Sequence, residues 1–380
     1  MKKILRLCPV YYPDTKFGGS VIADFEFDKF LINNGHTVRV ISTTNRFKFG
    51  YEKQTKDGIE IITFGSALPC IYGISMFAQI YIFYLLIINK WPDRIFIGGV
   101  WHALIITPSF WARVRKIPYI IVPHGMLFDN LIDLKRKFWK VVLIKVALKN
   151  ILCNASKIYC TNLAEKIDLE KKINRNAVVV SLPLVMELGP FLERGDSREN
   201  LEFEHRRPFV ISFIGRLTAK KNIDKLIHAM SLLPIEHRAK CELRIIGPDL
   251  EGLGKAIALK TKTHACFKGP LFGKDLINAY AETDLFVLPS ESENFAIGVV
   301  EAAACGAALL LTRNVGVTEY LPQNAFLECR TSASSIASSI EKIISGDVNI
   351  KDLVANARLA ALQFDSRSAN YETFRKDLLE

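Results

Sequence analysis

Short apolar runs alternate with longer amphipathic runs along the first half of the chain, and this alternation limits the fold more than any other feature. Intervening segments such as 21–33 and 162–172 carry apolar residues at helical spacing. Alternating strands and helices indicate a parallel sheet with helices on both faces. The predicted strands are residues 3–7, 38–43, 59–64, 94–98, 119–122, 157–160 and 178–182.

The same alternation restarts after residues 187–207, a charged and turn-rich segment that predicts an interdomain linker. A chain of 380 residues also exceeds most single cores. We therefore predict an α/β protein with domains at 1–190 and 191–363 and a final helix at 364–380 that packs back on the first domain. A cleft between two such domains is a preferred ligand site.

In the second half we expect strands at 209–214, 241–246, 265–268, 284–289 and 307–312, and helices at 221–233, 251–263, 274–282, 332–345 and 352–363.

The net excess of positive charge lies entirely in the first half. The chain has a net charge of +11, and residues 1–190 hold 26 Lys and Arg against 14 Asp and Glu. Nucleic acid, an anionic membrane surface or a phosphorylated substrate would each suit such a surface. Because the sequence shows no zinc finger, helix-turn-helix or RNA-binding aromatic motif, we discount nucleic acid.

The eight cysteines predict neither a disulfide framework nor a zinc site, since none forms a Cys-x-x-Cys pair. They are typical of small buried residues in a reducing compartment, which favours the cytoplasm. The apolar run near the start is short and is interrupted by Arg6, so it fits a first strand better than a signal peptide.

Two segments raise the question of membrane contact. Residues 71–88 are almost wholly apolar and reach the minimum length of a membrane span, but they lie between two predicted strands. A buried or membrane-facing helix is therefore the preferred interpretation. Residues 134–149 combine cations with large apolar side chains, and a surface-lying helix and a solvated helix face both remain open.

Candidate ligand-binding residues of the first half follow its strands. Gly18 and Gly19 precede a helix and would let backbone amides approach an anion, although a plain turn explains them equally well. His124 stands between Pro123 and Gly125 directly after a strand, where it could bind a substrate hydroxyl or be a satisfied structural histidine. His102 has a similar place but no glycine beside it to open space.

Arg216 and Lys221 are the candidate cations of the second half. They leave the end of the first strand of that half and enter the start of a helix. An Arg fork and a Lys point charge there suit a diphosphate, and a solvated basic turn is the alternative.

Glu293 and Glu301 stand eight positions apart, one in the loop after a buried strand and the other on the helix that follows. Ligands bind at this edge of parallel sheets, and a helix amino terminus there favours an anion. The two glutamates could form a general acid and base pair or accept hydrogen bonds from sugar hydroxyls.

Together these motifs resemble the retaining nucleotide-sugar glycosyltransferases of family 4, which have the GT-B fold of two Rossmann-like domains facing across a cleft. The resemblance rests on the run 215–217 followed by Lys221, and on Glu293 with seven residues before Glu301. Gly18-Gly19, the segment 92–97 and the run 123–127 resemble the amino-terminal domain of that family. The resemblance covers nearly the whole chain in the right order.

The resemblance implies roles by position. Arg216 and Lys221 would bind the donor diphosphate, Glu301 the ribose, and His124 the transferred sugar. Further residues would complete the donor site: Glu293, Asn294, Phe295 and Ala296 at the sugar, Gly18 and Gly19 at the phosphate or acceptor side, and Gly247 and Leu271 near the base. Members of the family need no bound metal or other cofactor, and this chain has no Asp-x-Asp motif.

Three departures from the family pattern are visible. Ala296 and Asn222 stand where glycine is usual, and residues 183–187 replace the usual Pro-Asn-Gly-Val-Asp. None removes a charged donor contact.

We therefore expect a retaining, metal-independent hexosyltransferase that uses a UDP-sugar or GDP-sugar and a glycan or polyprenyl-diphosphate-linked acceptor. The expected setting is bacterial O-antigen, capsule or exopolysaccharide synthesis in the cytoplasm, with the inner face of the plasma membrane as an additional location. A non-catalytic binding protein and a sugar phosphorylase on the same fold are the alternatives.

Overall fold

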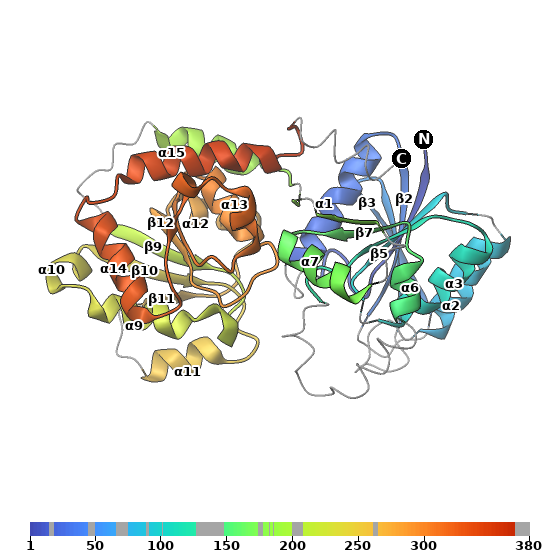
Figure 1. The fold of residues 1–380 in the computed structure, drawn as a ribbon, viewed down its shortest axis with the longest axis horizontal. Helices are drawn as coiled ribbons and strands as arrows, with labels where there is room; N and C mark the ends of the chain where they lie inside the picture. Colours follow the sequence, from blue (N-terminus) through green and yellow to red (C-terminus); the bar gives the residue numbers. More distant parts are fainter. Residues whose placement is uncertain are drawn as a thin grey trace. The chain divides into compact units, whose positions relative to one another are not determined.

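The computed structural model divides into two compact units, Met1–Leu182 and Pro183–Glu380, which we call unit 1 and unit 2 (Figure 1). Each unit is a sheet covered by helices. The structure describes residues 1–14, 19–44, 50–65, 75–88, 91–100, 102–126, 148–173, 178–181, 183–184, 186–199, 208–260 and 265–368.

Unit 1 is built on an eight-stranded sheet of order β3-β4-β2-β1-β5-β6-β7-β8. All neighbouring strands are parallel except β3 and β4. The strands are β1 (Lys3–Leu7), β2 (Thr37–Thr43), β3 (Tyr51–Lys56), β4 (Ile59–Phe64), β5 (Arg94–Gly98), β6 (Tyr119–Val122), β7 (Lys157–Cys160) and β8 (Val178–Ser181). The helical elements are α1 (Gly19–Asn33), α2 (Met76–Phe83), the π-helical η2 (Tyr84–Ile88), η3 (Ala103–Ile105), α3 (Ile106–Val114), α6 (Lys149–Cys153) and α7 (Leu163–Lys172).

The two faces of this sheet bury different chemistry because successive strand residues point to opposite sides. On β1, Leu5 and Leu7 join an apolar core with residues of α2, η2, α3 and α6. Arg6 points to the opposite face and meets acidic residues of α1. A charged centre is therefore buried on one side of the sheet and an ordinary apolar core on the other.

Unit 2 contains a six-stranded, wholly parallel sheet of order β11-β10-β9-β12-β13-β14. The strands are β9 (Phe209–Ile214), β10 (Cys241–Ile246), β11 (Ala265–Lys268), β12 (Leu285–Leu288), β13 (Ala308–Leu311) and β14 (Leu327–Glu328). The helical elements are α8 (Gly189–Glu199), η5 (Ala219–Lys221), α9 (Ile223–Leu232), α10 (Ile235–Arg238), α11 (Leu253–Lys260), α12 (Gly273–Ala281), α13 (Ile297–Ala304), η6 (Gly316–Tyr320), η7 (Gln323–Ala325), α14 (Ala333–Ile344), α15 (Ile350–Ala361) and η8 (Leu362–Phe364).

The centre of unit 2 is unusually apolar, and its residues are small where elements approach closely. Every residue of β12 and β13 is buried. The next element, α13, has the sequence IGVVEAAA and packs against β12, β13 and α15. Small side chains on α13 allow this close approach on several sides, so the loop before it is held between rigid elements.

The predicted parallel α/β architecture is confirmed in both units, and most predicted strands agree within one residue at each end. Two strands were not predicted. β3 has only exposed residues and pairs antiparallel with β4, so it carries no apolar alternation to detect. β14 spans just two residues.

Three further expectations concern connecting segments. The segment predicted as a linker contains the helix α8. Leu188, just before this helix, is buried in the core of unit 2, and Phe191 within the helix packs against that core. Residues 71–74 and most of 134–149 lie outside the described residues, as do 369–380 in the predicted final helix. Within the described part of the chain, no helix is long and apolar enough to cross a membrane.

Candidate functional site

The predicted cations and Glu293 occupy neighbouring loops of unit 2. β9 and β12 are adjacent and parallel, so the loops at their carboxyl ends, 215–222 and 289–296, emerge at the same edge of the sheet. Three hydrogen bonds join the loops. The Glu291 amide donates to the Lys220 carbonyl at 2.8 Å, Asn222 Nδ2 donates to the Pro289 carbonyl at 2.9 Å, and Lys220 Nζ donates to the Ser292 carbonyl at 3.2 Å. The edge is therefore one connected surface.

Lys221 and Glu293 form an ion pair at this edge. Lys221 Nζ lies 3.0 Å from Glu293 Oε1, and Lys220 Nζ lies 3.7 Å from the same oxygen. The side chains of Lys221 and Glu293 are only 14% and 12% exposed. Arg216 leaves the same loop as an exposed side chain. Two lysines thus contact one carboxylate, and the charge of Arg216 acts on Lys221, which leaves an excess of positive charge for an anionic ligand.

Burial and neighbouring charges shift the pKa values of both Lys221 and Glu293. Burial lowers the pKa of Lys221, and Lys220 and Arg216 lower it further, against the opposing effect of Glu293. Burial alone would raise the pKa of Glu293, but Lys221 and Lys220 outweigh it and hold that pKa below its usual value. Glu293 is therefore a stable anion, while Lys221 carries its charge in an unfavourable surrounding that an anionic ligand would relieve.

Two buried hydroxyls around the two loops, Thr218 Oγ1 and Ser290 Oγ, make no well-formed hydrogen bond with the described residues. The Ser290 hydroxyl still lies close enough to help hold down the pKa of Glu293. Because buried polar atoms are nearly always satisfied in proteins, these two hydroxyls are consistent with a polar ligand at this edge.

The backbone around Glu293 is fixed on its other side by a short parallel pairing with Val315. The Glu293 amide donates to the Asn314 carbonyl, and the Gly316 amide donates to the Glu293 carbonyl, both at 3.0 Å. The ring of Phe295 is buried against Phe364, with ring centres 5.6 Å apart. The loop thus presents Glu293, Asn294 and Ala296 from a rigid frame.

Ala296 and Asn222 both adopt the left-handed backbone region, with φ of 73° and 52°. Ala296 is the N-cap of α13, and its side chain supplies no capping acceptor. The first amides of a helix have no partner within the helix, so the start of α13 faces this edge as a positive dipole end. Glycine enters this backbone region without strain, which explains why the family that the motifs resemble usually has glycine at both positions.

Glu301 lies one turn inside α13 and has a different environment from Glu293. Its Oε2 accepts a hydrogen bond of 2.8 Å from the Tyr280 hydroxyl of α12. Burial raises the pKa of Glu301 to about 7, although the Tyr280 bond opposes the shift. None of the ion pairs among the described residues involves Glu301, whereas Glu293 is paired with Lys221.

Gly247 and Leu271 flank the same edge on the β10 side. Gly247 follows β10 with φ of 143°, and a Cβ at this position would lie 2.0 Å from the Gly215 carbonyl oxygen. Only glycine permits this approach between the two strand ends. Leu271 precedes α12 and packs half-buried against the core. These positions agree with a ligand surface that extends across the ends of β9 and β10.

In unit 1, His124 follows β6 in the left-handed region with φ of 53°, and its Nε2 lies 3.3 Å from Asp24 Oδ1 on α1. The next amide, of Gly125, donates to Glu165 Oε1 at 2.5 Å. Gly19 is the first residue of α1, and Gly18 lies outside the described residues. His102 is buried, its Nε2 is 3.0 Å from the Gly98 carbonyl, and burial lowers its pKa to about 4, as for a structural histidine.

The sequence interpretation missed the charged cluster behind His124. Arg6 of β1 is 1% exposed and donates from Nη1 to Asp24 at 2.9 Å and from Nε and Nη2 to Asp28 at 2.5 and 2.7 Å. Tyr11 also donates to Asp28 at 2.7 Å. Arg6 inside an apolar strand and two aspartates four positions apart on a helix were the available signals.

Asp24 links Arg6 to His124 and therefore sets the charge beside His124. Burial alone would raise its pKa, but Arg6 and His124 outweigh this effect and lower it. Gly98 makes room for this carboxylate, since a Cβ there would lie 2.7 Å from Asp24 Oδ2. Among the described residues, no group of three or more His, Cys, Asp and Glu side chains could hold a metal ion. The expectation that no cofactor is needed stays a prediction.

Comparisons with known proteins agree with this geometry. Residues 194–360 match the family model "Glycosyl transferases group 1". One subunit of the human phosphatidylinositol N-acetylglucosaminyltransferase is 23% identical over 88% of this chain and 66% of its own length. The serotype-specific mannosyltransferase WbdA of Escherichia coli is 27% identical over 44% of this chain and 21% of its own length. The chain thus spans a fifth to just under two thirds of the length of these relatives.

Solved structures identify the fold. Anabaena HepE in complex with UDP and glucose superposes with a TM-score of 0.73 at 16% identity and covers 100% of both chains. This likeness and the two Rossmann-like sheets confirm the expected GT-B architecture. The chain therefore has the GT-B fold, and its residues 194–360 are similar to the glycosyl transferases group 1 family.

Proposed function

We propose that this protein is a retaining glycosyltransferase that moves a sugar from a nucleotide-diphosphate donor to an acceptor hydroxyl. The observation that carries the proposal is the pairing of Lys220 and Lys221 with Glu293, beside Arg216, at the carboxyl ends of β9 and β12. A diphosphate leaving group gains negative charge as the glycosidic bond breaks. Fixed cations and a helix amino terminus stabilise such charge without reorganisation.

Each side chain of the cluster takes a role in this proposal. Arg216 and Lys221 bind the diphosphate, and the diphosphate relieves the unfavourable burial of the Lys221 charge. Glu293 and the backbone of Asn294, Phe295 and Ala296 bind hydroxyls of the donor sugar. Glu293 also holds the Lys221 ammonium at 3.0 Å, so the cation is positioned before the donor arrives.

Glu301 binds the ribose in this proposal. Tyr280 holds Oε2 in place, and the remaining carboxyl oxygen accepts from a ribose hydroxyl. Gly247 and Leu271 bring the ends of the neighbouring elements toward the base. In unit 1, His124 contacts the transferred sugar with its ring oriented by Asp24, and Gly18 and Gly19 approach the phosphate or acceptor side.

The names of the relatives support a UDP- or GDP-linked hexose and a lipid-linked or polysaccharide acceptor. The human relative is named for transfer to phosphatidylinositol, the E. coli relative for a serotype-specific mannosyl transfer, and HepE was solved with UDP and glucose. We propose a glycan or polyprenyl-diphosphate-linked acceptor in bacterial surface polysaccharide synthesis. The reaction would need no metal and would run in the cytoplasm, at the inner face of the membrane.

The test is nucleotide release from a panel of UDP- and GDP-sugars, with and without lipid-linked acceptors in detergent. We expect one donor to release its nucleotide faster when its acceptor is present, and the product to keep the anomeric configuration by NMR. Arg216→Ala should lower turnover by about 10²-fold, as for loss of a charge-stabilising donor. Arg313→Ala, an exposed arginine of unit 2 paired with Glu328, is the matched control.

Other outcomes would replace the proposal. Nucleotide binding without release from any donor would favour a non-catalytic binding protein. Sugar phosphate formation from a glycan and inorganic phosphate would favour a phosphorylase. An Arg216→Ala variant as active as Arg313→Ala would remove the diphosphate assignment.

A further inference from the structure

Unit 1 exposes a continuous apolar surface on two neighbouring helical segments. α2 and α3 pack side by side, as Figure 1 shows. We call their outward surface the α2–α3 face. It consists of Met76, Phe77, Ile80, Phe83, Tyr84 and Ile88 from α2 and η2, and of Ile106, Phe110 and Val114 from α3. These side chains are between 37% and 67% exposed.

The composition of this face differs from that of an ordinary surface helix. Every exposed residue between positions 76 and 88 is a large apolar or aromatic residue, and in α3 the remaining exposed residue is Arg113. The inward sides are apolar as well, with Ile82, Leu85 and Ala112 in the core. A helix that is apolar all round normally lies in a core or in contact with lipid, and a contiguous exposed patch marks an interaction site.

The segment of sequence that carries the face is mostly basic. Between positions 61 and 128 the sequence has five basic residues and a single acidic residue, Asp93. Arg113 follows Phe110 by three positions and therefore borders the face. Lys116 is also exposed, and neither cation takes part in an ion pair among the described residues.

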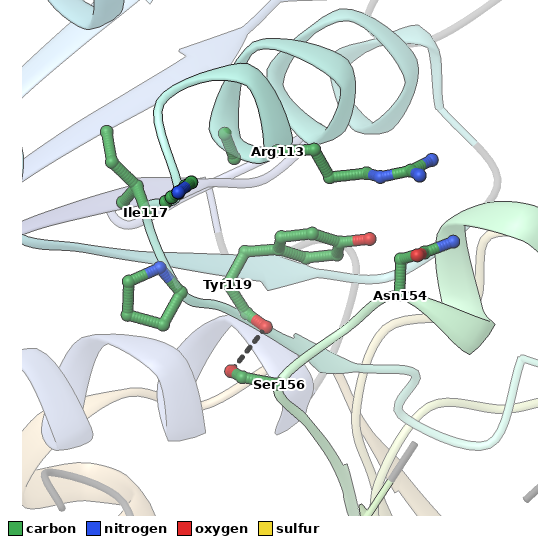
Figure 2. Close-up of a pocket in the computed structure, with 8 residues that line it drawn as sticks. Arg113, Ile117, Tyr119, Asn154 and Ser156 are labelled. Carbon is green, nitrogen blue, oxygen red and sulfur yellow. Dashed lines mark hydrogen bonds between the residues drawn. The ribbon is translucent and has the colours of Figure 1, made fainter. Parts of the chain in front are cut away.

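A small pocket lies where these cations leave α3 (Figure 2). It has a volume of about 310 Å³ and is lined by Arg113, Lys116, Tyr119, Asn154 and Ser156, among others. Its neutral groups have internal partners: the Tyr119 hydroxyl donates to the Ile151 carbonyl at 2.6 Å, and the Ser156 hydroxyl donates to the Tyr119 carbonyl at 2.8 Å. The two cations are its remaining donors for a ligand, and such an arrangement suits a phosphate group.

We propose that the α2–α3 face docks on an anionic phospholipid bilayer, with Arg113 and Lys116 contacting lipid phosphates at the pocket. The apolar side chains would enter the boundary between headgroups and acyl chains, as in interfacial helices that lie on a membrane. The segment would thus contact the bilayer without crossing it. The docking goes beyond the transfer reaction and rests on the proposed function only in that a lipid-linked acceptor would be met at the same surface.

A second copy of the chain is the competing occupant of an apolar face. In a two-fold dimer the same surface would meet itself, and the cations of both copies would lie near each other. The side chains of the face include no carboxylate, and Glu60, whose charge acts on Tyr81 of α2, is already paired with Arg39 and Lys53. Like charges across an interface oppose association. An anionic bilayer provides the complementary charge, so the charge distribution favours lipid over a second copy.

Vesicle flotation of the full-length protein tests the docking. We expect strong binding to vesicles of equal parts phosphatidylcholine and phosphatidylglycerol, and weak binding to phosphatidylcholine alone. Ile80→Ser combined with Phe110→Ser should abolish binding to both. Arg113→Gln combined with Lys116→Gln should weaken binding to the anionic vesicles by about 25-fold, or about fivefold per cation, and leave the weak binding unchanged.

Matched variants on unit 2 control for general effects. Leu250→Ser and Leu359→Ser remove equally exposed apolar residues, and Lys274→Gln removes an exposed cation. All should bind vesicles like the parent protein. Thermal unfolding of each variant shows whether it is folded, and if the double serine variant unfolds, the double glutamine variant still decides the question.

Several results would overturn the proposal. They are equal binding to both vesicle types, binding unaffected by either double variant, or a stable dimer in light scattering that the double serine variant converts to monomer. Inorganic phosphate at salt-matched ionic strength should not release the protein, and release would assign the pocket to free phosphate. Vesicle binding without sugar transfer from any donor would refute the proposed function alone, and transfer in detergent without vesicle binding would refute the docking alone.

Discussion

Both units bury an ion pair, but the two clusters differ in net charge and in their exposure to solvent. In unit 1, Arg6 is 1% exposed and is held by two carboxylates, Asp24 and Asp28. In unit 2, Glu293 is partly accessible and is paired with two cations, Lys221 and Lys220. The first arrangement satisfies its cation internally and leaves it closed to a ligand. The second leaves positive charge at a sheet edge, so charge balance separates a structural centre from a ligand-binding one.

Arg6 should show the largest effect on stability. Its guanidinium also lies 5.5 and 5.6 Å from the ring centres of Phe27 and Phe96, so all of its surface is packed. Arg6→Met leaves two buried carboxylates without a cation and should lower the free energy of unfolding by about 3–5 kcal/mol. Urea denaturation followed by circular dichroism measures this loss.

A compensated variant sharpens this test. Arg6→Met combined with Asp24→Leu and Asp28→Leu removes the whole centre, and replacement of a complete buried ion cluster by apolar residues is often neutral or stabilising. Recovery of stability in the triple variant would show that uncompensated charge causes the loss. Equal instability of the single and triple variants would assign it to packing.

Substitution of Lys221, in contrast to that of Arg6, should change stability little and turnover strongly. Because burial lowers its pKa, the folded protein holds this ammonium less favourably than water does. Lys221→Met should therefore change the free energy of unfolding by no more than about 1 kcal/mol, since the gain offsets the loss for Glu293. Its turnover should fall by about 10²-fold through loss of leaving-group stabilisation.

The control for Lys221 is Lys225→Met, which removes a lysine of α9 that pairs with Glu291 at 3.7 Å on the same side of unit 2. Steady-state nucleotide release and urea denaturation are measured on both variants. A Lys221→Met protein that loses several kcal/mol of stability and keeps its turnover would reverse the comparison between the two units.

Glu301 extends the comparison to a buried carboxylate with no cation paired to it among the described residues. Its pKa is raised from 4.5 to about 7 by burial, so the folded protein binds the proton more tightly than the unfolded chain. The resulting stability is fully present below about pH 4.5 and is lost as the pH rises through about 7. The shift corresponds to about 1–3 kcal/mol after allowance for partial exposure.

Glu301→Gln resembles the protonated carboxyl and should remove this pH-dependent loss. Unfolding free energies of the parent and variant are compared at pH 5 and pH 8, where the Asp and Glu residues of ordinary pKa are ionised in both. Equal pH profiles for the two proteins would mean that Glu301 does not titrate in this range.

An Asp24 variant tests whether the charged cluster of Arg6, Asp24 and Asp28 in unit 1 also contributes to activity. Asp24→Asn keeps the shape of the side chain but removes the charge beside His124, so the ring loses its fixed orientation. By analogy with partners that orient ligating groups, turnover should fall by about tenfold. The Michaelis constant for the donor should change little if His124 acts on the transferred sugar in the transition state.

Asp28→Asn is the matched control because Asp28 binds Arg6 and Tyr11, whereas Asp24 contacts His124. Both variants should lose stability, whereas only Asp24→Asn should lose turnover at a temperature where both are folded. Equal kinetic losses in the two variants would show that the centre acts only through stability.

The sequence predicted the parts of the fold that have a periodic apolar signal. The strands of both sheets and the glutamates around α13 were found this way, because burial on two faces leaves a continuous apolar run. β3 has no buried residue, and Arg6 is a polar residue in an apolar run, so pattern alone could not place either. The Lys221–Glu293 pair also needed three-dimensional contact, since 72 positions separate the residues.

The smallest expected effect distinguishes two substitutions that look alike in the sequence. Ala296 and Asn222 both replace a usual glycine in the left-handed region. Asn tolerates this region and its Nδ2 donates to the Pro289 carbonyl at 2.9 Å, whereas Ala296 gains no capping bond in exchange for its strain. Ala296→Gly should therefore raise the free energy of unfolding by about 0.5–1 kcal/mol, and Asn222→Gly should lower it by about 1 kcal/mol through the lost hydrogen bond. Urea denaturation resolves both signs. If both variants gained stability, the Asn222 bond would contribute nothing to the loop that carries Lys221. The rigid cation site of unit 2 would then rest on the Lys221–Glu293 pair, the backbone bond from Glu291 and the bond from Lys220 to Ser292.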